Sequence, residues 1–128
     1  MAPAGDASAT ARSTGLLRVP FIRRCDVDLG DGAPFTTYIV NINVLGAYVA
    51  RDGLPPMGAA LSFRFRMPGN EREIALSGVV AWLNPKQQHP VHSLPPGFGV
   101  KFVDLTPEDR GRIVGFVEDY AERHRTGR

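Results

Sequence analysis

Two asparagines stand two residues apart in the stretch YIVNINVLGAYVA, residues 38–50, which otherwise has the pattern of a half-buried strand. Asn41 and Asn43 would share one face of that strand, because successive side chains point to opposite faces. Asn is depleted from strand interiors, since its amide competes for backbone hydrogen bonds. Gly46 follows, and glycine permits a positive φ or the close approach of another group. We therefore predict a bend between Asn43 and Gly46, where either the amides shape the turn or a ligand docks.

Other residues that could carry chemistry are few and scattered. His89 and His92 lie in the sequence HPVH, but no Cys, Asp or Glu flanks them closely, and a zinc site needs further ligands. Cys25 lies in the middle of an alternating stretch with no histidine placed beside it, which favours a buried thiol over a nucleophile. We predict no metal site, no catalytic residue and no enzymatic activity.

The composition is that of one globular domain. The chain has 128 residues, of which 43% are hydrophobic, enough to bury a sizeable core. No apolar run approaches the roughly eighteen residues of a membrane span, and the N-terminus lacks the apolar stretch of a secretory signal. One cysteine excludes an internal disulfide. We expect a cytoplasmic protein in which residues 1–15, small and polar, form a flexible tail.

The charge is modest and argues little for nucleic-acid binding. The net charge is +2 and the sequence pI is about 9.0, with thirteen Arg against two Lys. Arginine is suited to phosphate groups and guanine edges, but such a bias follows equally from genome composition. The basic residues therefore do not define a nucleic-acid surface by themselves.

Alternation of apolar and polar residues between turn signals predicts about six strands. We expect them over residues 18–29, 35–42, 47–51, 61–67, 73–83 and 98–102. Leu76, Val80 and Trp82 are expected on one face of the fifth strand. The fourth strand alternates most regularly, with Phe63 and Phe65 inward and its arginines outward.

That placement of the phenylalanines bears on a rival interpretation, a small barrel that binds single-stranded nucleic acid. Such modules carry aromatic and basic side chains together on a solvent-facing strand. Here the aromatic and basic residues of the fourth strand occupy opposite faces. Nucleic-acid binding is therefore the weaker alternative.

A helix is predicted over residues 107–124. Thr106 is a good N-cap, Pro107 suits the first helical position, and the acidic residues after it complement the helix dipole. The apolar stripe of this helix comprises Ile113, Val114, Val117, Tyr120 and Ala121. Close turns and one terminal helix give a mainly β fold, a small six-stranded antiparallel β-barrel with one C-terminal α-helix, over residues 16–125.

Four segments, taken in order, resemble a bacterial PilZ domain, and the resemblance covers nearly everything after residue 15. They are LRVPF at 17–21, NINVLGAYV at 41–49, LSGVVAW at 76–82 and GFGVKFVDL at 97–105, the last followed by TPED. The resemblance implies a six-stranded barrel with a C-terminal helix, in agreement with the pattern of elements. It also implies that the usual ligand is the second messenger cyclic di-GMP, with no cofactor.

The family holds that ligand through two motifs, RxxxR before the first strand and [D/N]xSxxG at the bend. Arg18 matches the second arginine, while Thr14 occupies the place of the first. In the second motif Asn41 and Gly46 match, and Asn43 stands where serine belongs. Loss of one charge-assisted contact costs about 1.5–3 kcal/mol, roughly 10- to 150-fold in affinity.

Nearby arginines could compensate for the missing one. Arg12 lies two residues before Thr14, and Arg23 and Arg24 follow Arg18. The candidate ligand-binding residues implied by the resemblance are therefore Arg18, Asn41, Asn43, Gly46, Arg12 and Arg23.

The resemblance implies a signalling role. We expect a bacterial signalling adaptor that regulates motility, pilus or chemosensory machinery through a protein partner, with binding of the nucleotide weakened or lost. The alternative is a ligand-independent adaptor that binds protein through the barrel exterior or through residues 84–96.

Overall fold

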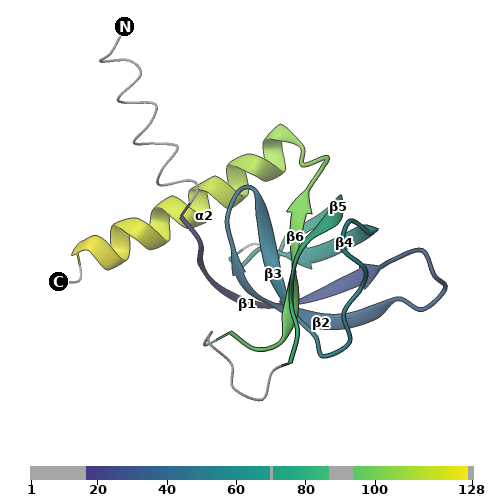
Figure 1. Cartoon of the computed structure of the whole chain (residues 1–128). Coiled ribbons are helices and arrows are strands. Elements are labelled where there is room, and N and C mark those ends of the chain that lie inside the picture. Colours follow the sequence, from purple (N-terminus) through teal and green to yellow (C-terminus); the bar gives the residue numbers. More distant parts are fainter. Residues whose placement is uncertain (1–16, 70, 87–93, 127–128) are drawn as a thin grey trace, which may run out of the picture.

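The computed structural model describes residues 17–69, 71–86 and 94–126 of the chain, and these form a closed barrel of six antiparallel strands with one helix (Figure 1). The strand order around the barrel is β1-β2-β3-β6-β5-β4. The predicted fold is confirmed. The elements are β1 (Val19–Asp28), β2 (Phe35–Ile42), β3 (Gly46–Ala50), β4 (Ala60–Arg66), β5 (Glu73–Asn84), β6 (Gly97–Phe102) and α2 (Pro107–Thr126).

The barrel interior is filled by the apolar residues of the alternating strands. Val19, Phe21, Cys25 and Val27 of β1 are buried, as their spacing predicts. Phe63 and Phe65 of β4 also belong to this core, while Arg64 between them and the other alternate residues of β4 are exposed. The described part of β4 therefore presents no aromatic side chain to solvent, which removes the feature expected of a single-strand binder.

Trp82 does not follow the prediction for β5. Leu76 and Val80 are buried, but 42% of Trp82 is exposed. The pairing between β5 and β6 shifts by one residue between Val80 and Trp82, and such a shift moves a side chain to the opposite face. The expectation that Trp82 shares the buried face with Val80 is wrong for this reason.

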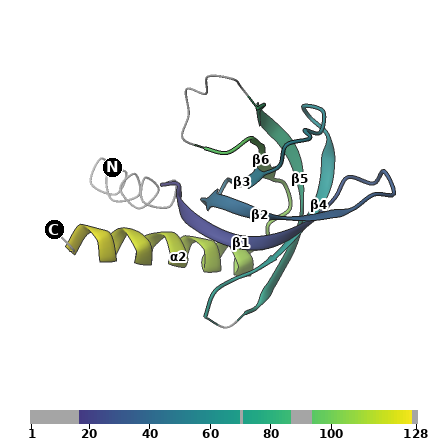
Figure 2. The same cartoon turned by 90° about the horizontal axis from the view of Figure 1, so that it is seen from below.

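Helix α2 lies against the barrel beside β1 (Figure 2). Ile113 and Val117 are fully buried, and the ring of Phe116 packs edge-on against Phe21 with centroids 5.1 Å apart. At the start of the helix the backbone N–H of Asp109 donates to Thr106 Oγ1 at 3.1 Å, which confirms the predicted cap. The helix continues two residues past its predicted end.

In the described part of the chain, no helix is both long and apolar enough to span a membrane.

Gly46 is required by the contact between β3 and β6. A Cβ on Gly46 would lie 2.0 Å from the carbonyl oxygen of Val100, far inside the van der Waals distance. Gly111 offers a contrast, since a Cβ placed there meets no atom within 4 Å. One glycine is thus fixed by packing, while the other occupies open space on a helix.

We predict that Gly46→Ala destabilises the protein by about 3 kcal/mol, because backbone atoms must move to admit the methyl group. Gly111→Ala serves as the control and should stabilise by about 0.5–1 kcal/mol, since alanine is the better helix former. Urea unfolding followed by circular dichroism measures both changes. Equal effects of the two substitutions would contradict the packing explanation.

Candidate functional site

Asn43 shapes the turn between β2 and β3. Its buried Oδ1 accepts hydrogen bonds from the backbone N–H groups of Leu45, at 2.9 Å, and Gly46, at 3.0 Å. The backbone N–H of Asn43 donates to the carbonyl of Gly46 at 2.9 Å. The Asn43 amide oxygen therefore satisfies two backbone donors that the turn would otherwise leave unpaired.

Asn41 has a different partner, although it lies only two residues away. Arg18 Nη1 donates to Asn41 Oδ1 at 2.9 Å and lies 3.5 Å from the carbonyl oxygen of Gly46. Partial burial lowers the pKa of the Arg18 guanidinium from its ordinary value. The structure thus brings together Arg18, Asn41 and Gly46, three of the residues expected at the ligand site.

These three residues line a surface groove of about 280 Å³. Tyr48, Trp82, Leu94 and Gly99 give the groove an apolar surface, and Lys101 adds a second cation. No carboxylate lines it among the described residues. A groove with apolar and aromatic surfaces and two cations suits a flat, anionic ligand such as a nucleotide.

Trp82 is the residue of this groove that the strand pattern misses. If Gly99 carried a Cβ atom, that atom would lie 3.3 Å from the Cβ of Trp82. The Trp82 side chain therefore lies close to a strand position that has no side chain. A glycine inside a strand often marks such a close approach. Gly99 was therefore the one local signal that something packs against β6.

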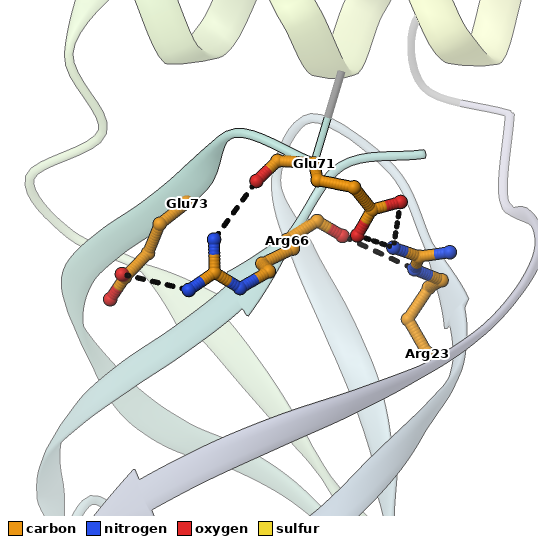
Figure 3. Close-up of polar contacts among 4 residues, drawn as sticks. All are labelled: Arg23, Arg66, Glu71 and Glu73. Carbon is orange, nitrogen blue, oxygen red and sulfur yellow. Dashed lines mark hydrogen bonds and ion pairs between the residues drawn. The ribbon is translucent and has the colours of Figure 1, made fainter. Parts of the chain in front are cut away.

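Arg23 lies in a different environment. Its Nη2 donates to both carboxylate oxygens of Glu71, at 2.8 and 3.0 Å, and its Nε donates to the carbonyl of Arg66 at 3.3 Å (Figure 3). Arg66 in turn donates to the carbonyl of Glu71 at 3.0 Å. Glu71 has a φ of 56°, a value uncommon for a residue with a side chain, and these contacts hold it there.

Arg23 and Arg24 line a second groove, of about 480 Å³, that shares no lining residue with the groove at Arg18. Compensation by Arg23 stays a prediction, and it would require that Arg23 leave Glu71. Arg12 and Thr14 lie outside the described residues, as does the rest of the predicted tail.

Cys25 offers no reactive thiol. Burial, together with the neighbouring charge of Asp26, raises the pKa of Cys25 to about 12. The thiol is therefore protonated at neutral pH and does not act as a nucleophile. Within residues 17–69, 71–86 and 94–126, no group of three or more His, Cys, Asp and Glu could hold a metal ion. His89 and His92 fall outside these ranges.

The protein is thus a small antiparallel barrel with a C-terminal helix, and the groove on its surface is suited to ligand binding. The chain belongs to the PilZ family, because the PilZ domain model matches residues 11–119. PilZ domains are non-catalytic, so the prediction that this chain is not an enzyme is confirmed by its family.

Three solved structures share the fold. The Bacillus subtilis inhibitor of motility, MotI/DgrA, aligns with a TM-score of 0.68 and 19% identity over 88% of this chain and 51% of its own. The PilZ domain of Escherichia coli YcgR with c-di-GMP aligns with a TM-score of 0.60 and 12% identity, over 86% of this chain and 95% of that domain. Borreliella burgdorferi PlzA in complex with c-di-GMP aligns with a TM-score of 0.54 and 16% identity, over 85% of this chain and 44% of PlzA.

This chain spans about half the length of the Bacillus subtilis inhibitor. No curated protein matches the sequence.

We predict that Asn43→Ala costs about 2 kcal/mol of stability, because it leaves two backbone N–H groups of a buried turn without their acceptor. Asn41→Ala is the matched control and should change stability by less than about 0.5 kcal/mol, since Asn41 is only partly buried and bonds an exposed arginine. Urea unfolding measures the free energy of unfolding of both variants. If Asn43→Ala costs no more than Asn41→Ala, Asn43 does not stabilise the turn.

Proposed function

We propose that this protein is a non-enzymatic bacterial PilZ receptor or adaptor that binds cyclic di-GMP weakly and acts through a protein partner. The observation that carries the proposal is the 2.9 Å hydrogen bond from Arg18 to Asn41, both of which line the groove. It joins the matching residues of the two family motifs in one place.

The groove offers groups that suit a cyclic dinucleotide. The Arg18 guanidinium has further N–H donors beyond the one given to Asn41, and these suit a phosphate oxygen or a guanine edge. Trp82 offers a half-exposed ring on which a guanine can stack. Lys101, on the neighbouring strand β6, adds a positive charge that attracts phosphate.

Two departures from the family motifs weaken the proposed site. Thr14 supplies no guanidinium, which removes one charge-assisted contact and about 10- to 150-fold in affinity. Asn43 is committed to the turn, where its Oδ1 already accepts two hydrogen bonds. We therefore place most of the recognition on Arg18, Asn41 and Trp82.

The proposed setting is the cytoplasm, and the proposed partner belongs to motility, pilus or chemosensory machinery. Support comes from the fold shared with an inhibitor of motility, which shows the fold alone. A ligand-independent adaptor is the alternative. In that case residues 84–96 or the barrel exterior would bind the partner. Replacing residues 87–93 should abolish capture if the contact is made by residues 84–96, and should leave it unchanged if it is made by the barrel exterior.

Isothermal titration calorimetry with cyclic di-GMP, with GTP as control, tests the proposed function. We expect weak, saturable binding of cyclic di-GMP, and a further loss of at least about tenfold in Arg18→Ala, because one charged contact disappears. A flat titration of the unaltered protein would favour the ligand-independent adaptor. An unchanged Kd in Arg18→Ala would remove Arg18 from the site.

We predict that Trp82→Ala weakens cyclic di-GMP binding by about 5- to 100-fold, as expected when a stacked base loses its aromatic partner. Tyr38→Ala is the matched control, since Tyr38 is also an aromatic residue half-exposed on the barrel but does not line this groove. The same calorimetric titration measures both variants. A similar loss in Tyr38→Ala would indicate a general effect on the barrel rather than stacking on Trp82.

A further inference from the structure

Tyr48 is a buried aromatic residue that does not belong to the barrel interior. Its neighbours in β3, Ala47 and Val49, pack into the core, so the alternation of the strand directs Tyr48 to the outer face. Only 2% of Tyr48 is exposed all the same. Something on the outside of the barrel therefore covers it.

The cover comes from the stem of the β5–β6 connection. The Tyr48 hydroxyl donates to the carbonyl oxygen of Pro95 at 2.5 Å and accepts a hydrogen bond from Asn84 Nδ2 at 2.9 Å. Asn84 Nδ2 also lies 3.3 Å from the same carbonyl. A Cβ on Gly97 would come within 3.0 Å of the hydroxyl, so a glycine leaves room for it.

The ring of Tyr48 meets the groove. Its centroid lies 5.4 Å from that of Trp82, with the two planes tilted by 45°. Gly99, which pairs with Tyr48 across the β3–β6 ladder, leaves space beside the Trp82 side chain. The Trp82 side chain thus packs next to both the Tyr48 ring and Gly99, a strand position without a side chain.

The polar contacts of Tyr48 are not needed to fill space. Phenylalanine would occupy nearly the same volume, and burying a hydroxyl and an amide costs free energy unless each finds a partner. The hydrogen bonds of Tyr48 are directional, so they fix the position of its ring relative to the Pro95 backbone more strictly than apolar packing would. Leu94, next to Pro95, lines the same groove as Trp82.

We propose that Tyr48 is a positioning residue for the groove: its ring sets the orientation of Trp82, and its hydroxyl, together with Asn84, fixes the Pro95 backbone and with it the neighbouring Leu94, which lines the groove. The proposal rests on the proposed function for its effect on nucleotide affinity. The orientation of Trp82 in the free protein is independent of that function and can be measured separately.

The test uses Tyr48→Phe in the full chain, with Thr37→Val as a matched control. Thr37 Oγ1 donates to the carbonyl of Ala50 at 2.5 Å, so the control also removes one hydroxyl-to-carbonyl bond from the barrel, but away from the groove. Trp82 is the single tryptophan of the chain, and its fluorescence therefore reports on the groove alone.

In ligand-free Tyr48→Phe we expect Trp82 emission at longer wavelength and about twofold stronger quenching by acrylamide. Affinity for cyclic di-GMP should fall by about 2- to 10-fold, the value of one neutral hydrogen bond. Thr37→Val should lower the unfolding midpoint to a similar extent while leaving both quenching and affinity as in the unaltered protein.

The proposal is overturned if Tyr48→Phe lowers the unfolding midpoint as Thr37→Val does but leaves Trp82 emission and quenching unchanged. If the unaltered protein binds no cyclic di-GMP, the proposed function fails, while the fluorescence of the free protein still decides the role of Tyr48. Should Tyr48→Phe not fold, Asn84→Ala provides the same readouts, and unaltered Trp82 quenching in that variant overturns the proposal.

Discussion

The close contact between β3 and β6 is the constraint on which the rest of the site depends. At one end of this strand pair a Cβ on Gly46 would lie 2.0 Å from the carbonyl oxygen of Val100, and at the other a Cβ on Gly97 would lie 2.0 Å from that of Val49. The two backbones can approach this closely only because both positions lack a side chain. Their contact brings the β2–β3 turn against β6, where the backbone N–H of Phe102 donates to the carbonyl of Leu45. Residues of this turn, of β6 and of β5 together line the groove.

Two buried amides then give the groove its shape. Asn43 accepts hydrogen bonds from the backbone of the turn that contains Gly46, while Asn84 donates to the hydroxyl of Tyr48, whose ring lies beside Trp82. They are the buried polar residues of the described part of the chain, and both serve structure rather than solvent contact. The charged groups of the groove, Arg18 and Lys101, are instead exposed, and we propose that Arg18 is the main one to recognise the ligand. Because different residues stabilise the groove and carry its charge, the shape of the groove does not depend on the few contacts that would set the affinity for a ligand.

Strand pattern and turn residues were sufficient to predict the barrel and its helix, because alternation and capping are local properties of the sequence. The regular alternation around Phe63 and the cap at Thr106 are both present as predicted. The meeting of Arg18 with Asn41, 23 residues apart, was expected from the family resemblance rather than from periodicity. The local sequence pattern does not predict this contact, because it carries no information on residues so far apart in the chain.

The errors arose where long-range pairing overrides local pattern. Trp82 was assigned to the buried face because the one-residue shift after Val80 depends on how β5 pairs with β6. The ion pair of Arg23 with Glu71, 48 residues further along the chain, likewise does not follow from local pattern, and a role of Arg23 at the ligand site stays a prediction. Tyr48 received no role from the sequence because its partners, Asn84 and Pro95, lie 36 and 47 residues away.

We propose that cyclic di-GMP binds in the groove lined by Arg18 and Trp82. The most direct test is a two-dimensional ¹H–¹⁵N NMR titration with cyclic di-GMP that follows the indole N–H of Trp82, which gives one signal because the chain has a single tryptophan. We predict that this signal and the Gly46 amide shift progressively and saturate together. Shifts confined to the amides around Arg23 and Arg66, with the indole signal unmoved, would contradict the claim.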